Sequence, residues 1–550
     1  MNYSDTSIVR GRTDEYADVV WRKDNTFDTS LELFTEIKKL RNVSGASFSE
    51  PFSMTVPELA AIVGDTSVNG RISIIGNPSL GDVKGMSIGM RHQDGGQFCG
   101  ELWVNELRLN GLEERGGTAG EARLEIQMAD FGDLTASASY STIGWGSLED
   151  RVFDRSLEST IEYDVATNLE LGKFLPDKWN VTIPFYAQYS KQRAQDEFDP
   201  YQLDLTVDEL LDITNDPVER DDIKDRSART TTIKTYNFTN VRKDRSSGSK
   251  KKPKPWDIEN VTASYGHTRT EYVDEFVISD ISDDYRGGLD YSYTSQSKPI
   301  EPFKKIKSKH LKILKEFNFN PVPQSFSFST QLRRFKNERE FRIPRDIDYV
   351  FNDQRFDWDR RYSLKWDFTK ALKFDFFATN FSVIDEIRQG GIRVDRNDRP
   401  FFDKFGREVE EVNGLASFED QQQAARDTLN SNLRSGGRNK DYNHSLTLSW
   451  TLPLRYLPGL DWVNVKAQYD SDYAWTTGSL AVNNGIPLGS ELDGVDGIQL
   501  GNIISNNQSR SVNATFNFDK LFDKSKYIKG LDKVKKPSTT RTRSKGDDVL

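Results

Sequence analysis

The spacing most suggestive of chemistry is Gly85-Met-Ser-Ile-Gly89, which matches the G-x-S-x-G pattern around a hydrolase nucleophile. In that pattern the serine stands on a sharp turn between a strand and a helix, where its hydroxyl faces the substrate. Here Ser87 lies within a β-like run from Val83 to Met90 that leads to a turn at Gly95-Gly96. We therefore expect Ser87 to be an ordinary strand residue, and we expect the chain not to be an enzyme.

Metal and cofactor chemistry has little support in the residue types. The histidines are scattered, without a second ligand at helical or hairpin spacing: His92, His267, His310 and His444. The single cysteine, Cys99, cannot form an internal disulfide or a thiolate cluster. Gly116–Gly120 lacks the lysine and the helix of a phosphate loop, so we interpret it as a flexible linker. We expect no metal site and no cofactor.

Two basic runs, Lys250–Lys254 and Lys304–Lys315, could bind a nucleic acid. The chain nevertheless carries a formal net charge of -10, whereas nucleic-acid binding needs a basic surface. We expect both runs to lie in solvated loops, or beside acidic lipid head groups at the rim of a membrane protein. No nucleic-acid partner is expected.

The first part of the chain, residues 1–115, differs from the rest. Apolar residues at helical spacing, with Thr29 and Glu32 as a capping box, predict a helix over residues 30–41. Short β-like runs follow at Arg71–Ile75, Val83–Met90 and Glu101–Leu109, separated by Gly, Asn, Pro and Asp. A small jelly-roll-like β domain with one short helix is the natural expectation. It could serve as a plug or as a periplasmic or lumenal insert.

From about Ala122 onward apolar and polar residues alternate, which predicts long antiparallel strands. One such run extends from Leu157 to Leu171. Ordinary globular strands have about 5 to 6 residues, whereas a tilted membrane strand needs about 9 to 11. The pattern therefore favours strands of a transmembrane β-barrel over those of a soluble β-sandwich, which would show the same alternation.

Two hairpin turns share a Leu-Pro pair closely followed by Trp. Their residues are Leu175, Pro176 and Trp179 in one turn and Leu457, Pro458 and Trp462 in the other. Proline suits such a turn because its φ is fixed, and tryptophan favours the boundary between membrane and water. We expect both turns at the membrane interface, on the periplasmic rim.

Roughly a dozen strands are predicted within residues 121–530, which we interpret as an arc of a large transmembrane β-barrel. Long charged loops are expected at about 191–256 and 385–441, against short turns elsewhere, as in bacterial barrels. Residues 531–550 form a polar tail or the start of a further loop.

The composition agrees with a barrel more than with membrane helices. Only 35% of residues are hydrophobic, mean hydropathy is -0.68, and no run approaches the ~20 apolar residues of a membrane helix. A barrel needs only one apolar face on each strand. The residues after Met1 do not form a signal peptide, so we expect this chain to be an internal segment of a longer outer-membrane protein at the cell surface.

Several ungapped stretches, in order, carry a family resemblance. They are Gly76–Leu80, Ser87–Arg91, Glu101–Leu109, Tyr140–Leu148, Phe198–Tyr201 and Asn237–Lys243. Together they resemble successive signatures of the SprA/Sov family, the giant outer-membrane translocon of the type IX secretion system. The resemblance rests on the order of the motifs more than on any one of them.

The resemblance implies a barrel that conducts folded cargo proteins to the cell surface, linked in some members to gliding motility. It also implies partners: secreted cargo with a C-terminal signal, a cargo-shuttle barrel, a plug protein and outer-membrane lipid. No catalytic residue carries over. Two other functions stay open from the residues alone, namely a stand-alone porin or transporter barrel and a soluble surface adhesin or carbohydrate-binding β protein.

Overall fold

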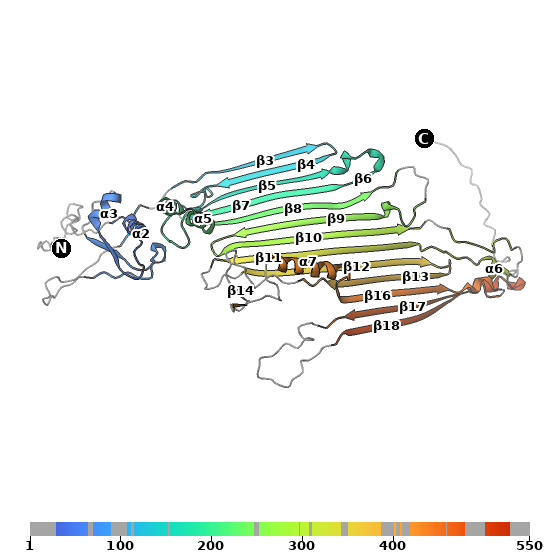
Figure 1. The fold of residues 1–550 in the computed structure, drawn as a ribbon. Helices are drawn as coiled ribbons and strands as arrows, with labels where there is room; N and C mark the ends of the chain where they lie inside the picture. Colours follow the sequence, from blue (N-terminus) through green and yellow to red (C-terminus); the bar gives the residue numbers. More distant parts are fainter. Residues whose placement is uncertain are drawn as a thin grey trace, which may run out of the picture.

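The protein is described here by a computed structural model. It describes residues 29–63, 70–89, 107–111, 115–151, 154–246, 252–295, 298–306, 311–342, 350–386, 401–402, 408–409, 418–457, 459–478 and 501–528. Within these residues an amino-terminal unit stands at one end of a single large antiparallel sheet (Figure 1).

The amino-terminal unit packs two helices against a two-stranded sheet. Helices α2 (Glu32–Ser44) and α3 (Val56–Val63) lie beside strands β1 (Phe52–Thr55) and β2 (Arg71–Ile74). A small core holds them together, formed by Leu33, Ile37, Val56, Leu59 and Ile74. The Val56–Leu59 spacing of α3 and the Leu33–Ile37 spacing of α2 each place two of these side chains on one face of their helix.

The predicted helix over residues 30–41 is confirmed as α2, but its capping box is wrong. The helix begins after Leu31, which makes no side-chain cap, and the backbone N–H of Glu32 donates to Ser30 Oγ at 3.2 Å. Its end follows the common rule, because Gly45 adopts φ 67°, a left-handed conformation that glycine allows without strain.

The jelly-roll-like domain expected for residues 1–115 needs correction. In the described residues of that range, β1 and β2 are the strands, and Val83–Gly89 runs without regular structure. Most of the run Glu101–Leu109 lies outside the described residues. The apolar side chains of this short region are buried by two helices instead of by a second sheet, so a local β-like pattern was not enough to form strands.

The large sheet has the strand order β18-β17-β16-β13-β12-β11-β10-β9-β8-β7-β5-β4-β3, with β6 paired to β8. Its strands are β3 (Ala119–Met128), β4 (Gly132–Ser141), β5 (Glu158–Glu170), β6 (Val181–Thr182), β7 (Pro184–Asp196), β8 (Ala228–Lys243), β9 (Val261–Val273), β10 (Val277–Thr294), β11 (Ser325–Phe341), β12 (Val350–Asp367), β13 (Leu372–Val383), β16 (Arg438–Thr451), β17 (Val463–Thr476) and β18 (Ile503–Phe516). The expectation of a mostly β chain with long antiparallel strands is confirmed. The sheet is open, with β3 and β18 at its edges.

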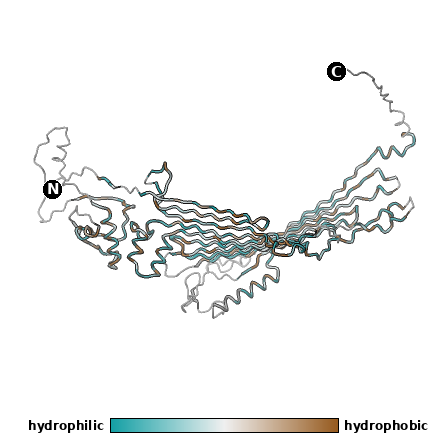
Figure 2. The backbone as a smooth tube through the Cα atoms, turned by 90° about the horizontal axis from the view of Figure 1, so that it is seen from above, coloured by the Kyte–Doolittle hydropathy of each residue, from teal (hydrophilic) through white to brown (hydrophobic). Residues whose placement is uncertain are grey.

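The sheet is strongly twisted, as is usual for β-strands of L-residues, and its longest strands, β10 and β12, have 18 residues. Seen from above, the strands pass through a narrow waist and fan apart on either side, and hydrophobic and hydrophilic residues alternate along them (Figure 2). None of the helices in the described part of the chain has the length and apolar character to cross a bilayer.

The prediction of a long loop at about 191–256 is partly wrong. It contains helices α4 (Val207–Ile213) and α5 (Pro217–Arg226) and the whole of strand β8, residues 228–243. β8 was missed because threonine and charged residues occupy most of it, which gives little apolar contrast between its two faces. Its β-branched threonines nevertheless favour a strand once β7 and β9 pair with it.

The region expected as a loop at 385–441 contains helix α7 (Phe418–Arg434), the short strands β14 (Phe401–Phe402) and β15 (Glu408–Val409), and the start of β16. Because consecutive strands are antiparallel, this connection and the one holding α4 and α5 emerge at the same end of the sheet. The opposite end carries the short turns at residues 129–131 and 368–371, but also the long connection 295–324. The expected contrast between short turns and long loops is therefore incomplete.

Candidate functional site

Strand register assigns the side chains of the sheet to two chemically different faces. One continuous cross-strand row reads Val261, Tyr291, Phe328, Tyr362, Ala378, His444 and Tyr473. The adjacent row, whose side chains point to the other side, reads Thr262, Asp290, Ser329, Arg361, Thr379, Asn443 and Ala474. We call these sides the apolar face and the polar face.

The apolar face carries its aromatic residues in a band at the end of the sheet opposite the amino-terminal unit. On β10 the band extends from Tyr293 to Tyr285, a rise of about 26 Å along the strand. Rings from neighbouring strands contact each other within it: Phe328 and Tyr362 have centroids 5.1 Å apart, and those of His444 and Tyr473 are 5.2 Å apart. At the strand tilt of about 35 to 45° found in membrane barrels, this rise corresponds to a height of about 20 Å, somewhat less than their apolar band of about 25 Å.

Toward the amino-terminal unit the same face becomes charged. Its apolar positions end at Lys234 on β8 and Arg269 on β9, which are paired in register, and at Lys191 on β7, one position further along the same face. Glu271 accepts hydrogen bonds from Lys234 at 3.1 Å and from Arg269 at 2.7 Å. Glu271 therefore neutralises part of the charge of Lys234 and Arg269, which limits the free-energy cost of placing these two side chains at the border of an apolar band.

The polar face is acidic along one edge of the sheet. On β3, β4 and β5 its side chains include the carboxylates of Glu121, Glu125, Asp133, Glu158, Glu162, Asp164 and Glu170 and the single guanidinium of Arg123. Further along, charges are paired across strands: Arg333 lies 3.0 Å from Asp284, and Arg339 lies 2.6 Å from Asp280. Serine and threonine fill most of the remaining positions, so this face is a hydrated surface with few apolar side chains.

A second feature is the polar junction that holds the amino-terminal unit against the connection between β7 and β8. Asp199, fully buried, organises that connection. Its carboxylate accepts from the backbone N–H groups of Tyr201 and Gln202 at 2.9 and 2.7 Å and from Arg226 Nε at 2.8 Å. Tyr201 in turn donates through its hydroxyl to the backbone oxygen of Glu275 at 2.8 Å, on the β9–β10 turn. The connection is thus fixed to the sheet.

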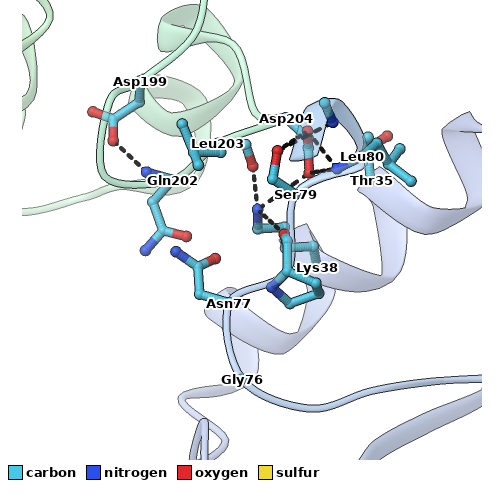
Figure 3. A network of polar contacts seen from close by, with 12 residues as sticks. Thr35, Lys38, Gly76, Asn77, Ser79, Leu80, Asp199, Gln202, Leu203 and Asp204 are labelled. Atoms are coloured by element: carbon cyan, nitrogen blue, oxygen red, sulfur yellow. Dashed lines mark hydrogen bonds and ion pairs between the residues drawn. The ribbon is translucent and has the colours of Figure 1, made fainter. Parts of the chain in front are cut away.

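Lys38 is the centre of the junction (Figure 3). Only 1% exposed, it donates from Nζ to the backbone oxygens of Pro78, at 3.0 Å, and of Leu203, and lies 3.5 Å from the carboxylate of Asp204. Burial lowers the pKa of Lys38 below its ordinary value, and Asp204 opposes that shift. The carboxylate of Asp204 also accepts from the backbone N–H of Leu80 at 2.9 Å.

The junction joins two of the motifs that carry the family resemblance. The side chain of Asn77, in Gly76–Leu80, donates to the backbone oxygen of Tyr201, in Phe198–Tyr201, at 2.9 Å. Sequence reasoning missed this site. The signal available in the sequence was Arg41, which follows Ile37 by four residues and so falls on the apolar stripe of α2. In the structure Arg41 is fully buried and donates to the backbone oxygen of Gly76.

The two Leu-Pro turns lie at the same end of the sheet, opposite the amino-terminal unit. Leu175 and Pro176 separate two short 3-10 helices, and Trp179 is 56% exposed. Trp462 packs with Phe516, at 5.8 Å between centroids, while Leu457 is partly exposed and Pro458 lies outside the described residues. Their location at a membrane interface stays a prediction.

The remaining candidates are dispersed. Ser87 lies in Val83–Gly89, which has no regular secondary structure, and His267 is hydrogen bonded to Asp283 at 2.8 Å and stacked on Tyr285. His444 lies among the rings of the apolar face, whereas His92 and His310 fall outside the described residues. Within the described ranges no group of three His, Cys, Asp or Glu side chains could hold a metal ion.

Comparison with known proteins adds one finding. Residues 5–211 match a protein-family model described as "Motility related/secretion protein". The match includes the amino-terminal unit, the Lys38 junction and strands β3 to β7. No curated protein matches the chain.

Proposed function

Because the chain belongs to the SprA family of motility-related and secretion proteins, we propose that its large sheet is an arc of an outer-membrane wall along which secreted proteins pass to the cell surface. The polar face lines the passage in this proposal, and the apolar face contacts lipid. The family is one of secretion and motility proteins and is not an enzyme family.

The observation that carries the proposal is the difference between the two faces. The row from Val261 on β9 to Tyr473 on β17 holds apolar and aromatic residues with one histidine, whereas the adjacent row is mainly polar. The separation has exceptions, because Phe377 lies on the polar face and Arg360 on the apolar face. A soluble sheet with one buried face would need a second layer over its aromatic band. Tyr291, Phe328 and Tyr362 instead stay partly exposed, as expected of rings that contact lipid.

The polar face suits the passage of folded proteins. Folded cargo exposes polar and apolar atoms together, so an apolar wall would retain it by burying that apolar surface. A hydrated wall of Ser, Thr and paired charges offers no such burial. The cargo in this proposal is the class implied by the family resemblance, proteins with a C-terminal signal, with a cargo-shuttle barrel and a plug protein as partners.

The free edges of β3 and β18 favour this proposal over a stand-alone porin. A strand edge exposes unpaired N–H and C=O groups that are costly in a membrane, and a barrel removes them by closing. The described strands leave both edges open, so they fit a wall that is continued by other strands.

The position of the amino-terminal unit constrains its role. The unit lies at the end of the sheet opposite the Leu-Pro turns (Figure 1). Two expectations from the sequence, turns on the periplasmic rim and a periplasmic unit, are therefore incompatible. With the turns on the periplasmic rim, we place the unit at the outer mouth of the passage, docked through Lys38.

The test uses neighbouring positions on β11 in the complete protein, in a Cys99→Ser background. Ser327→Cys and Ser329→Cys on the polar face should react with a membrane-impermeant maleimide in intact outer membranes, whereas Phe328→Cys should be protected until detergent is added. Equal reactivity of all three would overturn the assignment of faces. Depletion of the complete protein should also leave secreted proteins inside the cell, and normal secretion would refute the transport role.

A further inference from the structure

The connection between β10 and β11 is an unusual element of the rim that carries the Leu-Pro turns. Its described parts are residues 298–306 and 311–324, which we call the strap, with the short helix α6 (Lys312–Lys315) inside. The two parts are joined by an isolated antiparallel bridge between Ile300 and Phe319, with N···O distances of 2.9 and 3.1 Å.

The strap is fixed to the turn between β12 and β13. Asn318, a buried residue, accepts from the backbone N–H of Lys370 at 2.7 Å, and the backbone N–H of Asn320 donates to Phe368 at 2.9 Å. The indole of Trp366, on the apolar face, donates to the backbone oxygen of Asn320 at 3.0 Å. The strap is therefore a defined structure that begins where the apolar band ends.

A charge cluster adds to this attachment. Glu301 lies 2.8 Å from the ammonium of Lys304 and 2.6 Å from that of Lys370. Hydrogen bonds from these two lysines lower the pKa of Glu301 to about 2. The carboxylate stays ionised at neutral pH and holds the strap to the turn.

Away from this attachment the strap exposes apolar and basic side chains together. The exposed apolar residues are Leu311, Ile313, Leu314 and Phe317. Three exposed lysines, Lys305, Lys312 and Lys315, have no carboxylate partner among the described residues. Apolar side chains beside unpaired lysines are the chemistry of segments that lie in the interface of an anionic membrane.

The same combination recurs along this rim. Trp256 is 77% exposed, and the ammonium of Lys254 lies 5.5 Å from its ring centroid. Trp179 and Phe174 are exposed on the connection after β5. An aromatic ring at the head-group level keeps its body in the acyl region, and a neighbouring lysine reaches the phosphates.

We propose that the strap is a binding element for anionic phospholipid head groups on the periplasmic leaflet, with Leu311, Ile313 and Leu314 inserted at the acyl boundary and Lys305, Lys312 and Lys315 on the lipid phosphates. This inference rests on the proposed membrane-spanning function. Continuity with the apolar band through Trp366 and the excess of unpaired lysines both favour a lipid surface. An acidic protein partner would need charge complementarity alone and would not explain the adjacent exposed aliphatic residues.

The experiment places the complete protein in vesicles of phosphatidylcholine alone or of phosphatidylcholine mixed with phosphatidylglycerol. A nitroxide on Ile313→Cys, in the Cys99→Ser background, reports whether the strap contacts lipid or water, through its collisions with oxygen and with a water-soluble nickel complex. We expect lipid contact that increases with phosphatidylglycerol. Changing Lys305, Lys312 and Lys315 to Gln should weaken the partition of the strap on the order of a hundredfold, at roughly fivefold per lysine.

A matched control removes the same charge at the other end of the sheet, by changing Lys39, Lys84 and Lys224 to Gln. It should leave the nitroxide signal unchanged. Strands that insert normally while Ile313→Cys stays in water in both lipid mixtures would overturn the strap proposal alone. Burial of the label only after an acidic protein is added would overturn it as well. Failure of Phe328→Cys to become lipid-protected would instead refute the membrane-spanning function.

Discussion

The ammonium of Lys38 lies 3.5 Å from the carboxylate of Asp204, although the two residues belong to separate parts of the fold. Lys38 comes from α2 of the amino-terminal unit, and Asp204 from the connection that Asp199 organises and Tyr201 attaches to the β9–β10 turn. The contact is therefore the charged part of the link between the unit and the wall, to which Asn77 adds a hydrogen bond to Tyr201.

Lys38→Met should release the amino-terminal unit from the sheet. The substitution keeps the length of the side chain but leaves Asp204 and two backbone oxygens without their cation, and breaking a buried ion pair costs about 3 to 5 kcal/mol. We expect faster amide exchange in residues 76–80 and 199–206. Lys39→Met is the control, because Lys39 pairs only with Glu36 on the helix surface, at 3.6 Å. Unchanged exchange in Lys38→Met would mean that the unit is held elsewhere.

Phe328→Arg should hinder membrane insertion far more than Ser329→Arg, although the two positions are adjacent on β11. Phe328 lies in the apolar band, opposite Tyr291. In a membrane barrel an arginine costs about 2 to 4 kcal/mol at the bilayer midplane and about 0 to 1 kcal/mol near the interfaces, so we expect about 1 to 2 kcal/mol at this position. Ser329 faces the polar side, where an arginine stays hydrated. Denaturant unfolding of the protein in vesicles measures the difference. Similar losses for both variants would contradict the assignment of the faces.

Acid should loosen the strap in a defined pH window. The folded pKa of Glu301 is lowered from 4.5 to about 2, so the ionised carboxylate stabilises the fold above pH 4.5. That stabilisation is lost as pH falls from about 4.5 toward about 2, because the folded carboxylate is then protonated. Trp366, which donates to the strap, reports the change through its fluorescence. Glu301→Gln should remove this pH dependence, whereas Glu316→Gln, on the exposed surface, should retain it.

Arg360→Met should free the connection that contains α7. The Arg360 guanidinium donates to Ser382 Oγ, to Asn380 at 3.2 Å and to the backbone oxygen of Gly436 at 3.2 Å, and lies 4.6 Å from the Trp358 ring centroid. Loss of hydrogen bonds from a charged donor costs about 1.5 to 3 kcal/mol. Exchange should increase in residues 431–438.

Arg361→Met, one position along β12, provides the matched control for that variant. Its side chain points to the polar face, where no partner is found among the described residues, and a surface change of this kind stays within about 0.5 kcal/mol. Equal exchange in the two variants would show that Arg360 does not hold the connection.

The sequence by itself determined most of the long strands and the two faces of each. Side chains alternate across a strand as a local geometric rule, so the spacing of Tyr362, Leu364 and Trp366 was enough to place them on one side. The same holds for α2, where the spacing of Leu33 and Ile37 marks the buried stripe. Such patterns act within a few residues and need no partner to be recognised.

Only the tertiary structure decided which strands pair, where β8 lies and where the amino-terminal unit docks. β8 becomes a strand because β7 and β9 supply hydrogen bonds along both its edges, a condition that its threonine-rich sequence does not reveal. Lys38 is buried although it is a lysine on a short helix, because Leu203 and Asp204 provide the partners that its charge requires. A buried charge depends on groups far away in the chain, and no local pattern contains them.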